Sequence, residues 1–318
     1  MASAILDVQD LQVAYHTPRG PVRAVDGVTF TLAADERFGL VGESGSGKST
    51  IALALMRLIR PPGKIEGGQV VLDGVNVLQL PEEQVRQLRL ASIALVAQGA
   101  MNSLNPVTRV REQILDAIGD HQAKPSKREA DAKVASLLEQ VGLKAGVANM
   151  FPHELSGGMK QRVCIAIAIS LRPKVILADE PTSALDVVVQ RQVIETLRRV
   201  QEDLGASVVL VGHDMGLMAQ FVHRLGVMYA GRLAEVSPVK DIFEEPLHPY
   251  TKLLIASLPS LEERGKFQGI PGLAPSLLDR PPGCAFHPRC PNAMPRCSVE
   301  DPAFRQVRPD RWVACHLY

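Results

Sequence analysis

The sequence predicts an α/β fold with a parallel sheet covered by helices on both faces, followed by an extension of different texture. The first observation is a buried strand at residues 38–42 that runs through a Gly-rich turn into a helix. The second is a pair of strand–helix units at residues 175–204 and 207–225. The third is that 13 of the 23 prolines follow the second unit, where helical periodicity fades. We therefore predict one domain at residues 1–236 and an extension at residues 237–318.

Composition and charge limit the classes of function. The chain has 318 residues, and its 46% of apolar residues is ample for a packed core. A formal net charge of +1 provides no summed positive field that would steer it to nucleic acid or to an anionic lipid surface. The N-terminus lacks the basic and apolar regions of a secretory signal, and no run of 18 apolar residues could span a bilayer. We therefore expect a cytoplasmic protein that reaches a membrane only through a partner.

Apolar spacing predicts the elements of the first half of the chain. Residues 1–37 alternate apolar and polar side chains, with a break at a glycine, and are expected to form short strands. Residues 48–60 have helical spacing and are followed by two prolines and a glycine, which should end that helix. Residues 106–171 look mostly helical, and we assign a helical subdomain to about 99–171.

The Gly-rich turn at residues 42–49 fits the pattern G-x-x-x-x-G-K-[ST] and lies between a predicted strand and helix, as that pattern requires. Backbone N–H groups of such a turn cradle phosphate oxygens, Lys48 meets the β- and γ-phosphates, and Ser49 ligates Mg²⁺. An ordinary Gly-rich turn is the alternative. A dinucleotide G-x-G-x-x-G pattern fails because Thr50 stands where its third glycine belongs. The predicted nucleotide-binding residues of this turn are Gly42, Ser44, Gly45, Ser46, Gly47, Lys48, Ser49 and Thr50.

Two adjacent carboxylates, Asp179 and Glu180, follow the apolar strand at residues 175–178. Open α/β sheets bind ligands at the carboxyl ends of their strands. Asp179 can hold Mg²⁺ through water, and Glu180 can polarise an attacking water, a general-base contribution of about 10²- to 10⁴-fold. A solvated surface pair is the alternative, although a buried apolar strand seldom ends in two charged residues that have no role. With the phosphate-binding turn, these carboxylates predict a P-loop nucleoside triphosphatase.

The segment LSGGMKQR at residues 155–162 resembles the signature of ATP-binding-cassette (ABC) proteins. It opens a predicted helix, whose free N–H groups and positive dipole end suit a γ-phosphate. An N-capped helix with glycines for close packing is the alternative. In this family two cassettes pair head to tail, so the signature of one chain acts on ATP held by the other. The signature residues are Ser156, Gly157, Gly158 and Met159.

The resemblance covers residues 1 to about 235 and assigns four further positions. Tyr15 is placed like the aromatic residue that stacks on adenine, and Gln98 like the glutamine that senses Mg²⁺ and the permease. Asp186 lies in a stretch that resembles the loop crossing the dimer interface, and His213 looks like the switch histidine that contacts the γ-phosphate. Hydrolysis is then expected to require a dimer. With the motifs above, the resemblance implies catalytic roles for Lys48, Gln98, Glu180 and His213, and Mg²⁺ contacts for Ser49, Gln98 and Asp179.

Two longer stretches, residues 97–106 and 227–259, resemble the ATPases of oligopeptide, dipeptide and nickel importers. The segment from His248 to Thr251 is the most distinctive, whereas Gly99 departs from the aspartate common in relatives. The resemblance implies a P-loop cassette with a mixed-sheet core, an antiparallel β region and a helical subdomain. It also implies the ATP-hydrolysing motor subunit of a peptide importer, with oligosaccharide or nickel uptake as alternatives. The implied partners are a paralogous ATPase, two permease subunits that hold the chain at the cytoplasmic face of the inner membrane, and an external substrate-binding protein.

Four of the five cysteines, Cys284, Cys290, Cys297 and Cys315, lie in the last 35 residues. They are spaced too widely for the C-x₂₋₄-C pairs of common zinc modules, but clustered thiols in a reducing compartment suggest a metal. The surrounding sequence resembles the C-terminal region of peptide-importer ATPases, some of which carry a [4Fe-4S] cluster on four cysteines. We predict such a cluster in a structural role, with zinc and unligated thiols as alternatives. Cys164 is expected to be a small buried hydrophobe.

Two readings from other classes compete with the importer ATPase. A soluble cassette ATPase acting on nucleic acid or ribosomes would need tandem cassettes, a coiled-coil insertion or a basic arm, and the near-neutral charge disfavours it. A metal-binding regulatory protein that only binds ATP would not need both Glu180 and His213. We therefore expect a hydrolytic site and no nucleic-acid partner.

Overall fold

The computed structural model describes residues 4–121, 126–258 and 269–318. The described chain folds into two compact units, each of which combines segments that are distant in the sequence. The strand that leads into the Gly-rich turn and the Cys-rich extension belong to the same unit. The main segments are Gln79–Leu210 in the first unit and Asp7–Thr31, Arg37–Leu78 and Val211–Tyr318 in the second.

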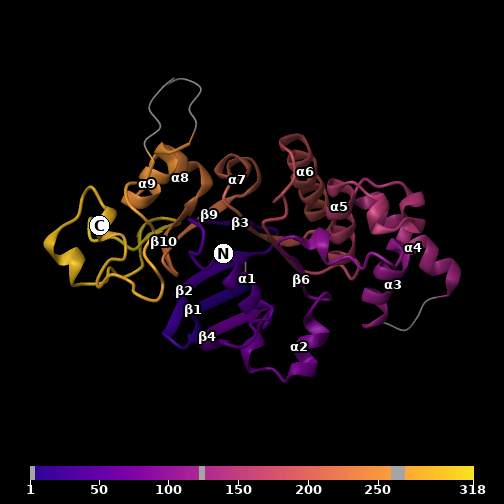
Figure 1. Ribbon diagram of the computed structural model, residues 1–318, viewed down its shortest axis with the longest axis horizontal. Helices are drawn as coiled ribbons and strands as arrows, with labels where there is room; N and C mark the ends of the chain where they lie inside the picture. Colours follow the sequence, from indigo (N-terminus) through magenta and orange to yellow (C-terminus); the bar gives the residue numbers. More distant parts are fainter. Residues whose placement is uncertain (1–3, 122–125, 259–268) are drawn as a thin grey trace. The chain divides into compact units, whose positions relative to one another are not determined.

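The first unit contains neighbouring strands and a group of helices. In chain order its elements are α2 (Glu82–Leu88), β6 (Ile93–Val96), η2 (Ala100–Asn102), α3 (Val110–Gly119), α4 (Lys127–Gln140), η3 (Ala145–Asn149), η4 (Pro152–Glu154), α5 (Gly157–Ala168), β7 (Val175–Asp179), α6 (Val187–Leu204) and β8 (Ser207–Val211). The strand order is β8, β7, β6, and β6 and β7 pair in parallel, so their carboxyl ends lie at one edge. Helices α3, α4 and α5 pack against one another, and α5 also packs against α6 (Figure 1).

The second unit contains strands of two sheets. In chain order its elements are β1 (Ala4–Thr17), β2 (Gly20–Ala33), β3 (Arg37–Val41), α1 (Lys48–Leu55), β4 (Gly63–Leu72), β5 (Val75–Asn76), η1 (Val77–Gln79), α7 (Met215–Phe221), β9 (Arg224–Tyr229), β10 (Arg232–Pro238), α8 (Val239–Glu244), α9 (Pro249–Ala256), η5 (His287–Arg289), η6 (Pro295–Ser298), β11 (Arg305–Arg308) and β12 (Arg311–Val313). One sheet has the order β2, β1, β4, β5, and β1, β2 and β4 lie side by side in Figure 1. The other includes the run β11, β12, β10, β9, β3, in which β3 and β9 are parallel and β9 and β10 antiparallel. The predicted mixed sheet and antiparallel β region are therefore present.

The predicted buried strands form the cores of the units. Every residue of β7 and β8 is buried, and β3 is buried from Phe38 onward. Such continuous apolar runs are typical of strands covered on both faces. In the second unit the rings of Phe30 and Phe38 stack with centroids 5.0 Å apart. Among the helices of the described ranges, none is long and apolar enough to cross a membrane.

Capping residues set the ends of two predicted helices. Helix α4 lies in the stretch that was expected to be mostly helical, and α6 lies in the first predicted strand–helix unit. Ser126 begins α4 through a capping box, and Asp186 begins α6 by accepting two backbone N–H groups. Gly205, with φ of 62°, ends α6. The sequence therefore carries a suitable cap at each of these three helix ends.

The helix predicted at residues 48–60 is shorter than expected, because α1 ends at Leu55. Arg57 adopts a left-handed conformation with φ of 51°, and the Leu58 N–H donates to the Leu53 oxygen at 2.8 Å. This hydrogen-bond pattern closes a helix end that usually carries glycine. An arginine in that position gave no sequence signal, so the prediction relied on the later prolines and was wrong.

The N-terminal strands are also longer than predicted. Strands β1 and β2 have 14 residues each, and Gly27, with φ of 74°, lies inside β2 rather than at a break. The domain boundary between residues 236 and 237 stays a prediction, and β10 runs across it from Arg232 to Pro238. A single strand therefore connects the predicted cassette to the predicted extension.

A buried polar cluster fixes the start of α9. Glu235 of β10 has no exposed surface, and its carboxylate accepts the N–H groups of Leu247 at 3.0 Å and His248 at 2.8 Å. His248 Nδ1 accepts the Tyr250 N–H at 3.0 Å and caps α9. Burial lowers the pKa of His248 to about 4, because the imidazolium ion would lose its hydration, and the nearby Lys252 charge acts in the same direction.

The neutral state of His248 should make stability depend on pH. The unfolded chain binds this proton near pH 6.5 and the folded chain only near pH 4, so the unfolded state holds more protons between these values. Lowering the pH from 7 to 5 should therefore reduce the free energy of unfolding by about 2 kcal/mol through this group. Urea unfolding at both pH values should show a loss about 2 kcal/mol smaller for His248→Asn, which keeps a polar cap but does not titrate. An equal pH dependence of the two proteins would contradict this assignment.

Candidate functional site

The Gly-rich turn at residues 42–49 leaves the buried end of β3 and enters α1 at Lys48. Gly42 and Gly47 have φ values of 151° and 103°, which favour glycine. A Cβ atom at Gly42 would collide with the carbonyl oxygen of Met228, and one at Gly47 with that of Ala24. Close backbone approach on both sides therefore requires these two glycines.

The turn wraps around the ammonium group of Lys48, which is only 6% exposed. Lys48 Nζ donates to the carbonyl oxygens of Gly42 at 2.9 Å and Glu43 at 3.0 Å and lies 3.4 Å from Ser46 Oγ. A lysine ammonium has three rotatable donors, so it can exchange such oxygens for those of a phosphate. The other predicted residues of the turn surround it: Ser44 and Gly45 are exposed, and Ser49 and Thr50 are half-buried in α1.

Two more predicted residues belong to the same unit as this turn. Tyr15 of β1 is half-buried, and a Cβ atom on Gly63 would lie 2.7 Å from Tyr15 Cε1, so the backbone packs closely on the ring. His213 is exposed. The preceding Gly212 N–H donates to the Leu40 oxygen at 3.1 Å, which places this segment beside β3.

The first unit brings two of the predicted catalytic side chains together. Gln98 follows β6, Glu180 follows the neighbouring β7, and Gln98 Nε2 donates to Glu180 Oε2 at 2.8 Å. Asp179 is the last residue of β7 and is buried. Glu180 adopts a left-handed φ of 45°, which is uncommon for a residue with a side chain. Such strain at the end of a strand is frequent in functional sites.

The signature and the proposed interface loop both begin helices of the first unit. Ser156 caps α5 by accepting the Met159 N–H at 3.3 Å. A Cβ atom on Gly158 would collide with a methyl group of Val189 in α6, and one on Gly157 would lie 3.1 Å from the Leu185 side chain. The packing alternative therefore accounts for part of the pattern of glycines, because α5 could not approach α6 as closely with larger residues. Asp186 caps α6.

The Cys-rich extension brings its four cysteines into one neighbourhood. The Cys284 N–H donates to the Cys297 oxygen at 2.9 Å. The pKa of the Cys284 thiol is raised to about 11, mainly by burial and to a smaller extent by the nearby thiols of Cys315, Cys297 and Cys290. Across the described ranges, however, no group of three or more His, Cys, Asp or Glu side chains is arranged to hold a metal ion. Cys164 is buried, as predicted.

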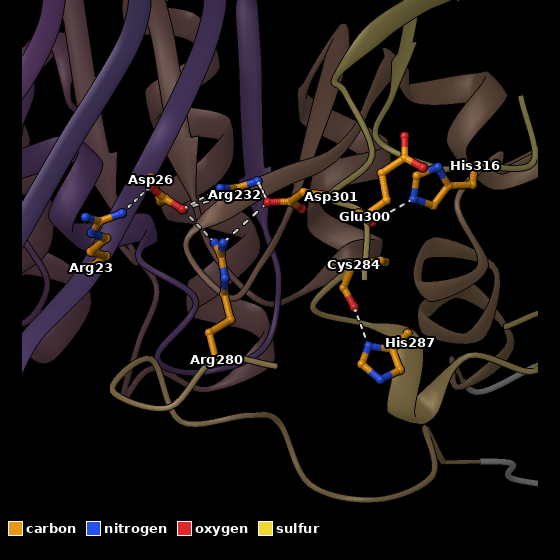
Figure 2. A network of polar contacts seen from close by, with 9 residues as sticks. All are labelled: Arg23, Asp26, Arg232, Arg280, Cys284, His287, Glu300, Asp301 and His316. Atoms are coloured by element: carbon orange, nitrogen blue, oxygen red, sulfur yellow. Dashed lines mark hydrogen bonds and ion pairs between the residues drawn. The ribbon is translucent and has the colours of Figure 1, made fainter. Parts of the chain in front are cut away.

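An ion-pair network joins the extension to β2 and β10 (Figure 2). Asp26 accepts hydrogen bonds from Arg232 Nε at 2.8 Å and Arg280 Nη1 at 2.6 Å, and Asp301 forms ion pairs with the same two arginines. Burial by itself raises the pKa of Asp26, but the hydrogen bonds and charges of Arg232 and Arg280 outweigh it and hold that pKa below its usual value. The Asp26 N–H in turn donates to the Gly231 oxygen at 2.9 Å.

Sequence reasoning missed a second connection, from the extension to the Gly-rich turn itself. Glu43 occupies a position that the motif leaves unspecified, yet its carboxylate pairs with Arg289 and its N–H donates to the Tyr250 hydroxyl at 3.0 Å. The only sequence signal was the distinctive segment around Tyr250. Neither the motif nor the cysteine spacing indicated that Arg289 would reach the turn.

Comparison with known proteins places the chain in a family. Residues 25–183 match the family described as ABC transporter. The oligopeptide transport ATP-binding protein OppD of Salmonella typhimurium is 42% identical, over 99% of this chain and 94% of its own. The chain belongs to the ABC transporter family. Within that family, residues 234–297 match the oligopeptide/dipeptide transporter C-terminal region.

Further relatives of this ABC protein support the same family assignment. The dipeptide transport ATP-binding protein DppD of Escherichia coli is 41% identical, over 98% of this chain and 96% of its own. The dimeric structure of a post-hydrolysis state of the ATP-binding cassette MJ0796, bound to ADP and Pi, superposes with a TM-score of 0.66 at 28% identity and covers 74% of this chain and 98% of that one. The predicted family, the cassette fold and the class of ABC-type transporter ATPase are therefore confirmed.

The packing of the turn predicts different effects for two glycines within it. Gly45 and Gly47 both have positive φ, so alanine at either should reduce the free energy of unfolding by about 1 kcal/mol or more. Alanine at Gly47 also collides with the Ala24 carbonyl oxygen, whereas a Cβ atom at Gly45 meets nothing within 4 Å. Gly47→Ala should therefore lose at least about 2 kcal/mol more than Gly45→Ala in chemical denaturation. Equal losses for the two variants would refute the packing described here.

Proposed function

We propose that this chain is the ATP-hydrolysing motor subunit of a membrane importer for peptides. The single observation that carries the cargo class is the match of residues 234–297 to the oligopeptide/dipeptide transporter C-terminal region. Relatives named for oligopeptide and dipeptide transport are about as long as this chain, which supports the same role. Oligosaccharide or nickel uptake by the same motor is the alternative, since the external binding protein and permease choose the cargo.

The turn at residues 42–49, with Tyr15, would hold ATP. Its backbone N–H groups would receive the phosphate oxygens, and Lys48 would exchange the carbonyl oxygens of Gly42 and Glu43 for the β- and γ-phosphates. Tyr15 would stack on the adenine base. His213 would contact the γ-phosphate and help to orient the attacking water.

The carboxylates at the end of β7, Asp179 and Glu180, would take part in hydrolysis. The hydrogen bond from Gln98 supports a fixed orientation of Glu180, which would polarise the attacking water. Ser49, Gln98 and Asp179 offer the hydroxyl, amide and carboxylate oxygens that suit Mg²⁺. When bound, Mg²⁺ supplies a positive charge that neutralises the negative charge developing on the phosphate.

Hydrolysis would occur in a head-to-tail dimer with a paralogous ATPase. Ser156, Gly157, Gly158 and Met159 would close over ATP held by the partner, and Asp186 would lie at the interface. The side chains of Val187 and Val188, next to Asp186, are each 67% exposed, which supports burial of this helix start against another protein. Two permease subunits would hold the dimer at the cytoplasmic face of the inner membrane, and an external binding protein would deliver the cargo.

The extension at residues 237–318 would carry a [4Fe-4S] cluster on Cys284, Cys290, Cys297 and Cys315. Mutual proximity of the thiols supports this, as does the Met294 N–H directed at Cys297 Sγ at 3.5 Å. Four thiolates would match the ligand count of a [4Fe-4S] cluster. The two nearby histidines hydrogen-bond to backbone oxygens instead, His287 to Cys284 and His316 to Glu300.

Substitution of the proposed general base tests the hydrolytic role. Glu180→Gln should lower ATP turnover by about 10²- to 10⁴-fold, because the amide cannot polarise water, while ATP binding is retained. Phosphate release and equilibrium nucleotide binding measure the two effects. Glu195→Gln is the control, because that side chain is 71% exposed on α6 and should leave both unchanged. Undiminished hydrolysis by Glu180→Gln would refute the assignment.

Removal of one proposed cluster ligand tests the metal. Aerobically purified protein should be brown, with a visible thiolate-to-iron absorption band and about four iron atoms per chain. Cys290→Ser should lose both the colour and the iron. Cys164→Ser, which alters a buried cysteine of α5, should keep them. Colourless protein containing one zinc ion per chain would contradict the cluster.

A further inference from the structure

Glu43 is held in the phosphate-binding turn at three points. Its carboxylate accepts two hydrogen bonds from Arg289, Nη1 to Oε2 at 2.8 Å and Nη2 to Oε1 at 2.9 Å. Its backbone N–H donates to the Tyr250 hydroxyl at 3.0 Å. Its backbone oxygen accepts from Lys48 Nζ at 3.0 Å. Glu43 thus links the extension to the lysine that would meet the phosphates.

Arg289 uses every donor of its guanidinium group. Besides the fork on Glu43, Nη1 donates to the Tyr229 hydroxyl at 3.1 Å, Nη2 approaches the Gly272 oxygen at 3.4 Å, and Nε donates to the Pro271 oxygen at 2.7 Å. A guanidinium has five N–H groups, and each has a partner here. The side chain is only 6% exposed, so water screens the pair with Glu43 weakly. A lysine has three donors and cannot reproduce this arrangement.

Aromatic rings fix the position of Arg289 and of its partner. The ring of Tyr229 lies 4.7 Å from that of Tyr250 and 5.1 Å from that of Phe286, and Tyr250 lies 5.4 Å from Phe286. The Arg289 guanidinium carbon stands 5.8 Å from the centre of the Tyr229 ring. Tyr250 and Phe286 are almost fully buried. The cluster packs α9, β9 and the segment around Phe286 against one another.

We propose that Arg289 is a positioning residue for ATP binding: through Glu43 it fixes the turn whose carbonyl oxygens hold Lys48. This inference rests on the proposed nucleotide site and adds to it a residue outside every sequence motif. Without the fork, Glu43 would keep only its two backbone contacts, and the turn would have to be ordered further when ATP binds. That ordering lowers affinity without altering the chemistry at the γ-phosphate.

The inference also gives the Cys-rich extension a specific task. Arg289 immediately precedes Cys290, and Phe286, whose ring packs on Tyr229 and Tyr250, lies two residues after Cys284. The segment between two proposed cluster ligands therefore supplies the Arg289 contact to the turn. Cluster ligation by the cysteines would hold this segment in shape, so ATP affinity would depend on the integrity of the extension.

Two single variants and their combination test the inference in the full-length chain. Arg289→Lys and Glu43→Gln should each weaken binding of a non-hydrolysable ATP analogue about tenfold, measured by isothermal titration calorimetry with Mg²⁺ present. In steady-state hydrolysis the KM for ATP should rise by a similar factor, while kcat stays within about twofold. The double variant should bind no more than about twofold more weakly than either single variant, because both remove the same interaction.

The matched control is Arg308→Gln, which breaks another ion pair of the extension, with Glu245 at 2.7 Å, away from the turn. It should leave ATP affinity unchanged. If Glu43→Gln binds the ATP analogue within twofold of wild type, the inference is overturned, whatever the folding stability of the variant. Glu43→Gln also decides the question if Arg289→Lys fails to fold. Multiplicative effects in the double variant, or an equal effect of Arg308→Gln, would also overturn it. Lys48→Ala tests the nucleotide site separately, since normal ATP binding by that variant would refute the proposed function itself.

Discussion

Close backbone contact on both sides of the turn between β3 and α1 is the constraint on which the second unit depends. The carbonyl oxygen of Met228, in β9, and that of Ala24, in β2, occupy the space that side chains at Gly42 and Gly47 would need. The Gly231 N–H also donates to the Ser46 oxygen at 3.1 Å. The shape of the turn is therefore set by strands far away in the sequence. Any element that displaces β2, β9 or β10 displaces the turn as well.

The C-terminal extension is one such element. Its strand β12 pairs with β10, with Val313 opposite Glu235, so the extension continues the sheet that contains β3. Two arginines of the extension also form ion pairs with this unit. Arg280 pairs with Asp26 of β2, and Arg289 pairs with Glu43 of the turn. Removing one member of such a partly buried pair leaves the other charge uncompensated, which is costly. The extension is thus part of the same compact unit as the Gly-rich turn, although it follows the predicted cassette in the sequence.

The sequence predicted those features of the fold that are determined by residues close together in the chain. The turn, the buried strands and the capped helix α6 were readable because a motif, an apolar run and a side-chain cap each act within a few residues. The end of α1 was missed because Arg57 takes a conformation that usually belongs to glycine. The role of Glu43 was missed for a different reason. The motif fixes only the residues that touch phosphate, whereas the partner of Glu43 lies 246 residues away and is brought near by the sheet.

Some residues have two roles, and a sequence pattern cannot distinguish one role from the other. Ser156 and Asp186 are predicted contacts in a dimer, and both also cap the helices that they precede. The two roles support each other physically. Because Asp186 Oδ1 accepts the N–H groups of Val188 and Val189, the first turn of α6 is rigid while Val187 and Val188 remain exposed. An apolar surface that is already ordered loses little conformational entropy when a partner covers it. The cap therefore prepares the surface that the proposed dimer would bury, and a substitution at Asp186 would alter the helix and the interface together.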